Sequence, residues 1–245
     1  MKKYLVAALL LGGTGISYAG KDMLPAESAS TTGGKMIAMA MGVADFQYLS
    51  EDHDLKYTEA DAKLFAQTLK EQSGGQLSEA NLHLLLGKQA TYQAVNDMMG
   101  QVLREAGTND TVVLYFSTHG VLIDDAGFLM AYDSPNNENL ANQSISYRIM
   151  EVLISQTLAK NVLVFSDACH SAIGGAGFKS GPTNPINGKL GDLQGRHESV
   201  FLLASSVINQ VTHEGPEYGG GHGAFTWELV QGLQGKSDIN HDGRV

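Results

Sequence analysis

The stretch Asn161-Val-Leu-Val-Phe-Ser-Asp-Ala-Cys169-His-Ser171 joins an apolar run to the only cysteine of the chain. The uninterrupted apolar residues 162–165 are typical of a strand buried on both faces, as in a parallel sheet. Polar residues mark the C-terminal end of this strand, and open α/β sheets place their chemistry at that end. We therefore expect a buried strand that carries the thiol of Cys169 to a functional site.

A second stretch, Thr111-Val-Val-Leu-Tyr-Phe-Ser-Thr-His119-Gly120, follows the same pattern and ends on a histidine. A single cysteine with a distant histidine is the pattern expected of a nucleophile and its base, because the two need to meet only in the fold. The structural alternative is a buried cysteine and a hydrogen-bonded core histidine. The residues alone leave both interpretations open.

Strand and helix patterns alternate along the chain, which predicts an α/β fold with a mostly parallel central sheet flanked by helices. Glycine pairs and N-cap residues, such as Thr91, separate the segments. A short hairpin arm is expected at 127–133, and a polar loop at 135–143. The expected strands are 36–42, 81–86, 111–120, 161–169 and 200–204, and the expected helices are 59–72, 92–106, 144–158 and 224–233.

The first 19 residues have the outline of a secretory signal peptide: a basic start, a short apolar run and small residues before a cut after Ala19. A secreted or periplasmic protein is therefore expected, with an uncleaved anchor as the alternative. Residues 20–35 form a flexible leader, and 36–245 form one domain. Within that domain, residues 172–197 are rich in Gly and Pro, which predicts an exposed loop.

The formal net charge is −10, and it becomes about −12 once two lysines leave with the signal peptide. Such a charge disfavours nucleic acid as a partner and argues against stable membrane association after cleavage. It suits basic substrates or divalent cations, or is simply a solvated acidic surface. One cysteine excludes intramolecular disulfides, so the thiol is buried, paired between chains or reactive.

The C-terminal residues resemble half of a calcium loop. Asp238, Asn240 and Asp242 match positions 1, 3 and 5 of that loop, with Gly243 at position 6. The bidentate acid at position 12 would lie beyond the last residue. These three residues are therefore weak metal candidates, and a turn rich in Asp, Asn and Gly is the alternative.

Several short motifs, in this order, resemble those of the caspase-like cysteine peptidases of the metacaspase type, peptidase family C14, over residues 36–245. The strand-end motifs Tyr-Phe-Ser-Thr-His-Gly and Asp-Ala-Cys-His-Ser carry most of the resemblance. The full set is Met39-Ala-Met-Gly42, Leu85-Leu-Gly-Lys-Gln-Ala-Thr91, Tyr115-Phe-Ser-Thr-His-Gly120, Asp167-Ala-Cys-His-Ser171, Ala204-Ser-Ser206 and Gly223-Ala-Phe-Thr226.

The resemblance implies a caspase-like (caspase-hemoglobinase) fold and a thiol protease, that is, a cysteine endopeptidase with a His119–Cys169 dyad. It also implies an oxyanion hole made by the backbone N–H groups of Gly120 and Cys169. An acidic S1 pocket formed by Asp61, Ser117 and Asp167 would take Arg or Lys at P1. The expected partners are therefore proteins or peptides with basic residues. The chemistry requires no cofactor, and calcium is an open candidate as an activator.

Two features leave alternatives open. Thr58 and Asp61 have capping-box spacing, so Asp61 is either an S1 residue, a capping residue or both. Thr118 replaces the usual glycine before the histidine, which casts doubt on the shape of the cleft and keeps a catalytically silent binding module as the alternative function.

If basic P1 residues are accepted, self-cleavage sites are expected in the loop 172–197. The basic residues there are Lys179, Lys189 and Arg196.

Overall fold

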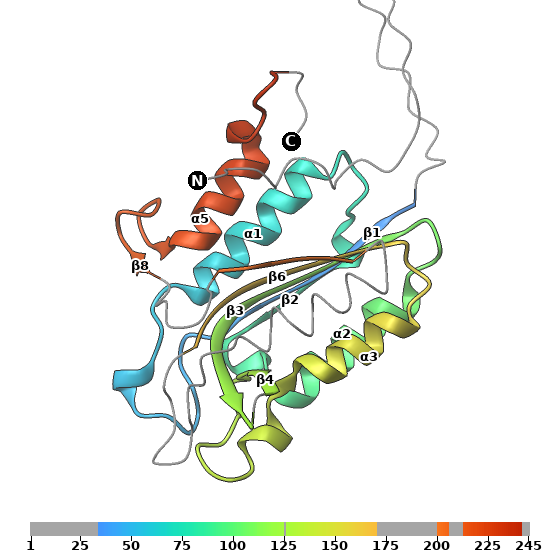
Figure 1. Cartoon of the computed structure of the whole chain (residues 1–245). Helices are drawn as coiled ribbons and strands as arrows, with labels where there is room; N and C mark the ends of the chain where they lie inside the picture. The colour runs from blue at the N-terminus through green and yellow to red at the C-terminus, as the bar shows by residue number, and fades with distance from the viewer. Residues whose placement is uncertain (1–33, 125, 171–199, 206–212, 242–245) are drawn as a thin grey trace, which may run out of the picture.

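The computed structural model describes residues 34–124, 126–170, 200–205 and 213–241, with the backbone alone at positions 169 and 170 (Figure 1). The expected signal peptide, most of the leader and the whole loop 172–197, with Lys179, Lys189 and Arg196, lie outside the described residues. So do Asp242 and Gly243.

Five parallel strands form the centre of the sheet, as the sequence predicts. The strand β3 is longer than expected, and its extension turns back as an antiparallel hairpin with β4, which in turn pairs with β5. The parallel strands lie in the order β2 (Leu82–Leu86), β1 (Met36–Gly42), β3 (Thr111–Ile123), β6 (Asn161–His170) and β7 (Val200–Ala204), and the hairpin strands are β4 (Ala126–Leu129) and β5 (Ile145–Ser146).

Helices cover both faces of the sheet, as Figure 1 shows edge-on. The helices α1 (Thr58–Gln72) and α5 (Ala224–Gln231) lie on one face, and α2 (Tyr92–Glu105) and α3 (Tyr147–Gln156) lie on the other. None of the helices in the described ranges is long and apolar enough to cross a membrane.

Alternation along the strands divides the buried side chains into two apolar clusters. In β1, Ala38 and Ala40 belong to the cluster under α1 and α5, whereas Met39 and Met41 belong to the cluster under α2 and α3. The small alanines suit the face that α1 covers, since α1 also contributes Phe65 there. A side-chain period of two therefore assigns alternate residues of β1 to opposite faces of the sheet.

The helix limits largely follow the sequence. The Thr91 hydroxyl accepts a hydrogen bond from the N–H of Ala94 at 3.2 Å, so the predicted cap of α2 is confirmed. Ser146 is the N-cap residue of α3 without a side-chain hydrogen bond to the helix. The last α-helix ends at Gln231, two residues earlier than expected, because a π-helical turn, Gly232–Lys236, follows it.

Shorter elements connect these layers. A two-stranded ribbon, β8 (Glu214–Gly215) with β9 (His222–Gly223), precedes α5. The expected polar loop contains one short 3-10 helix, Leu140–Gln143. The other 3-10 helices in the described ranges are Glu51–His53, Glu79–Asn81 and Gly87–Gln89.

Candidate active site

The C-terminal ends of β3 and β6 bring the two expected catalytic residues together. His119 and Cys169 are directly paired positions of the parallel β3–β6 ladder, and Ser117 and Asp167 form the pair two residues earlier. The Gly120 backbone lies beside that of His170 on one strand and Leu129 on the other. The oxyanion-hole role of the Gly120 and Cys169 N–H groups stays a prediction.

The imidazole of His119 is buried and held from two sides. Its Nε2 lies 2.6 Å from the carbonyl oxygen of His53, and its ring stacks on Phe46 with centroids 4.9 Å apart. A carbonyl oxygen only accepts hydrogen bonds, so Nε2–H donates, and Nδ1 carries the lone pair of the neutral ring. Burial lowers the pKa of His119. The ring is therefore held in the tautomer whose Nδ1 can accept a proton.

Thr118 fits its strand without backbone strain, so the replacement of glycine is tolerated at this position. Its buried hydroxyl donates to the Met130 carbonyl at 2.8 Å, and the Met130 N–H donates to the His119 carbonyl at 2.9 Å. Among the described non-glycine residues, positive φ angles occur at Asp124 and His241 and not at Thr118. Thr118 therefore ties the histidine strand to the chain that follows β4.

Asp61, Ser117 and Asp167 converge on one small pocket of about 30 Å³, so the structure brings the three expected S1 residues together. All three side chains are buried. The pocket takes its walls from the start of α1, the ends of β3 and β6, and the β8–β9 ribbon. Its remaining lining residues are Leu55, Thr58, Thr118, Glu214 and Gly223.

The carboxyl group of Asp61 is 2% exposed and contacts the ribbon before α5. The N–H of Gly223 donates to both of its oxygens at 3.1 Å, and His222 Nδ1 lies 2.8 Å from Oδ1. Burial, with the charge of Asp167 second, raises the pKa of Asp61 to about 8. A Cβ atom at Gly223 would lie 2.8 Å from Asp167 Oδ2, so a side chain here would displace that carboxyl group.

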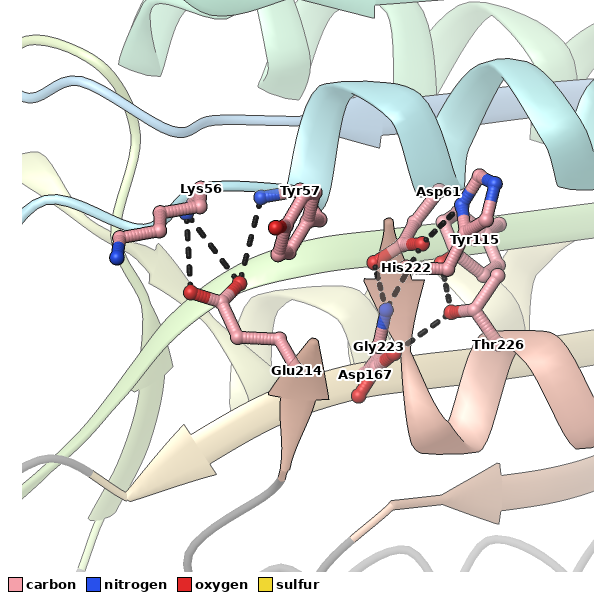
Figure 2. A network of polar contacts seen from close by, with 9 residues as sticks. All are labelled: Lys56, Tyr57, Asp61, Tyr115, Asp167, Glu214, His222, Gly223 and Thr226. Atoms are coloured by element: carbon pink, nitrogen blue, oxygen red, sulfur yellow. Dashed lines mark hydrogen bonds and ion pairs between the residues drawn. The ribbon is translucent and has the colours of Figure 1, made fainter. Parts of the chain in front are cut away.

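The expected capping box at the start of α1 is wrong. Tyr57 is the N-cap residue without a side-chain hydrogen bond, and Thr58 Oγ1 finds no partner among the described residues. Instead, the Glu214 carboxylate accepts from the backbone N–H groups of Lys56, at 3.1 and 3.3 Å, and Tyr57, at 3.3 Å (Figure 2). A distant carboxylate thus supplies the negative charge that a helix N-terminus favours, and Asp61 contacts the ribbon instead.

Asp167 ends a buried chain of hydroxyl groups, which Figure 2 shows between β3 and α5. The Thr226 hydroxyl donates to Asp167 Oδ2 at 2.6 Å, and the Tyr115 hydroxyl lies 2.5 Å from Thr226 Oγ1. Because the single proton of Thr226 goes to the carboxyl group, Tyr115 donates to Thr226. Burial raises the pKa of Asp167 and that of Tyr115.

Three buried oxygens in the pocket find no hydrogen-bond partner within the described part of the chain: Thr58 Oγ1, Ser117 Oγ and Asp167 Oδ1. Leaving a buried polar atom unpaired costs about 1–3 kcal/mol. No Lys or Arg is among the described residues that line the pocket. The pocket therefore offers hydrogen-bond acceptors, with two carboxyl groups that a bound cation would favour in their ionised form.

The weak metal candidates gain no support. Asp238 and Asn240 lie just after the π-helical turn, whereas Asp242 lies outside the described residues. The ranges that the structure describes contain no group of three or more His, Cys, Asp or Glu side chains placed to hold a metal ion.

Several contributors to the pocket were not expected as site residues. Thr226 and Tyr115 belong to motifs that the resemblance includes, so their roles carried a sequence signal. Glu214 and His222 lie outside those motifs, and their contacts reach Lys56 and Asp61 across 158 and 161 residues. No local pattern indicates such contacts.

The central parallel sheet, flanked by helices and ending in a histidine–cysteine pair beside an acidic pocket, defines an α/β protein of the caspase-like class. The family model of the caspase domain, peptidase family C14, matches residues 35–242. The chain therefore belongs to the caspase-domain family of cysteine peptidases, as its motifs suggest.

One solved structure similar to this chain is that of protein GSU0716 from Geobacter sulfurreducens. Its TM-score is 0.55 at 21% sequence identity, and the match covers 82% of each chain, which supports the fold. No match was found among curated proteins.

Proposed function

We propose that the chain is an exported, metacaspase-like cysteine endopeptidase that hydrolyses peptide bonds after Arg or Lys through Cys169 and His119. The observation that carries the P1 preference is the pocket that joins two buried carboxyl groups with unpaired hydroxyl oxygens. Ser117 and Asp167 lie two strand positions before the dyad, about 6.6 Å along the strands. A basic side chain that reached the pocket would therefore hold its carbonyl near the dyad.

In the proposed mechanism, Nδ1 of His119 accepts the thiol proton and the Cys169 thiolate attacks the scissile carbonyl. The imidazolium then protonates the leaving amine as the acyl-enzyme forms. Neutral His119 subsequently activates the water that releases the acid product and restores the thiol. The Nε2–H bond to the His53 carbonyl holds the ring in the tautomer that this step uses.

The test uses fluorogenic peptides that differ only at P1: Arg, Lys, citrulline and Asp. We expect cleavage after Arg and Lys, and citrulline, the neutral analogue of Arg, to be slower by about 100-fold, because it lacks the charge that two carboxylates require. Removal of the base in His119→Ala should lower kcat by about 10²- to 10⁴-fold. Cys169→Ala, which lacks the nucleophile, should show no turnover.

Each assay is run with calcium and with a chelator, because calcium is a proposed activator. A preference for Asp over Arg would overturn the basic pocket. Equal turnover by wild type and Cys169→Ala would overturn the dyad. Amino-terminal sequencing of the exported protein checks the proposed cut after Ala19.

A further inference from the structure

His222 contacts a pocket carboxyl group and belongs to none of the motifs that mark the family resemblance. Its Nδ1 lies 2.8 Å from Asp61 Oδ1, and its ring stacks on Trp227 with an interplanar angle of 11° and centroids 6.0 Å apart. Figure 2 shows the ring beside Asp61, at the start of α1. The side chain is 16% exposed, so it is mostly enclosed by protein.

The backbone that carries His222 is fixed by the two residues that follow it. Gly223 donates its N–H to Asp61, and the N–H of Ala224 donates to the His213 carbonyl at 2.7 Å. Gly219, at φ +62°, packs directly on the Trp227 ring, where a Cβ atom would lie 2.1 Å from the nearest ring atom. The Trp227 ring, on which the His222 ring stacks, is therefore itself held in place.

An Asp61 carboxylate that receives N–H groups from both His222 and Gly223 has its plane and rotamer fixed. A guanidinium group binds a carboxylate through two parallel N–H bonds and so depends on that plane. An ammonium group acts as a point charge and depends on it much less. Fixing Asp61 should therefore matter more for Arg than for Lys.

We propose that His222 is a positioning residue of the pocket, which holds Asp61 in the orientation that an arginine side chain at P1 requires. This inference rests on the proposed function, since it refines how the same pocket recognises its substrate. In this proposal His222 does not contact the reacting atoms, and it acts only through Asp61.

Other charged or titratable groups also face Asp61: Asp167 on β6, Tyr115 on β3 and Glu214 on β8. While the pocket is empty, the Asp61 carboxyl group carries a proton below about pH 8. The protonated carboxyl group can then donate a hydrogen bond to Nδ1 of His222. When a cation enters, the ionised carboxylate needs a donor at the same place. A neutral imidazole can present either an acceptor or a donor at Nδ1, because its proton can be on either ring nitrogen.

The test compares His222→Asn, His222→Gln and His222→Leu on peptides with Arg or Lys at P1. The side-chain amide of Asn lies close to the position of Nδ1 and can donate or accept, whereas the Gln amide extends past it. We expect kcat/KM for Arg to fall about 10-fold in the Gln and Leu variants, mainly through KM, because one hydrogen bond to a charged group is lost. Lys should lose less, and Asn should restore most of the Arg preference.

An Arg-to-Lys ratio within 2-fold of wild type in both the Gln and Leu variants would overturn the inference. So would a fall in kcat that is equal for both substrates, since that indicates a general structural defect. Circular dichroism and Tm confirm folding of each variant, and the Gln variant serves if Leu does not fold. If wild type cleaves neither substrate, the proposed function fails, which is a separate outcome.

Discussion

Two adjacent residue pairs on the same ladder of β3 and β6 have very different surroundings. The upper pair, His119–Cys169, lies two strand positions beyond the lower pair, Ser117–Asp167. Two segments hold the upper pair. The segment between β1 and α1 does so through the His53 carbonyl, and the residue after β4 does so through the Thr118–Met130 hydrogen bond. The helix α5 holds the lower pair through Thr226. In the proposed function, chemistry and selectivity would therefore depend on different parts of the chain.

Burial acts on both pairs, with opposite consequences for the pKa values. It lowers the pKa of His119 and raises that of Asp167, because in each case the charged form is disfavoured. Both groups are thus biased toward the neutral state while no substrate is bound. In the proposed function, a basic side chain in the pocket would reverse this bias at Asp61 and Asp167, so recognition would involve a change of charge.

Asp167→Asn should separate the two pairs with the largest effect. We expect kcat/KM for Arg substrates to fall about 100-fold, because a buried charge partner is lost, while citrulline substrates change little. Alkylation of Cys169 by iodoacetamide, a small reagent that needs no S1 pocket, should keep its rate. Steady-state kinetics and mass spectrometry measure the two effects.

The matched control is Glu228→Gln, which removes an exposed carboxylate on the same α5 helix. It changes the formal net charge equally and should leave both rates as they are. Equal losses for Arg and citrulline in Asp167→Asn would mean that the two pairs cannot be separated.

Asp61→Asn should alter how the stability of the folded protein depends on pH. We expect this effect to be smaller than that of Asp167→Asn on activity. The folded-state pKa of Asp61, about 8, lies above its ordinary value of 3.8, so the folded protein binds this proton more tightly than the unfolded chain. Stability is therefore lost as pH rises from about 4 through about 8. We expect Tm to fall less between pH 5 and pH 8 in the variant than in wild type. Each kcal/mol of unfolding free energy corresponds to about 2–4 °C in Tm.

Calorimetry of the substrate-free protein measures this slope, and Glu228→Gln again serves as the control. Parallel curves for Asp61→Asn and wild type would show that the carboxyl group of the empty pocket is ionised in the folded protein.

Thr118→Val should have the smallest effect, confined to the support of the upper pair. Val keeps the branched shape but cannot donate to the Met130 carbonyl, so we expect a loss of about 1 kcal/mol, or about 2–4 °C in Tm. Thr118→Ser keeps the hydroxyl and should retain the hydrogen bond. If Val melts at the wild-type temperature, this bond does not hold the strand as the structure indicates.

The sequence predicts the strands and their polar ends well because these features depend on local patterns. The apolar run before Asp167 requires a buried strand, and a side-chain period of two places Ser117 and Asp167 beside the dyad. The S1 set could therefore be assembled from the resemblance and the strand geometry together.

The same reasoning fails where distant residues compete with local ones. Thr58 and Asp61 have the spacing of a capping box, yet Glu214 satisfies the start of α1 and leaves Asp61 to the ribbon before α5. His222, in a glycine-rich turn, carries no periodic signal at all. Only the tertiary arrangement shows that this turn packs against the first helix.

The hydrogen bonds between Asp61 and Gly223 span 162 residues, and this separation has a consequence for the order of assembly. Contacts so distant in sequence form late, because a long loop must close before they are gained. During synthesis, the histidine and cysteine strands are complete while the ribbon before α5 is still missing. A nascent chain would thus hold its nucleophile without the pocket that directs cleavage, and selective activity would begin only with the docking of the last helix.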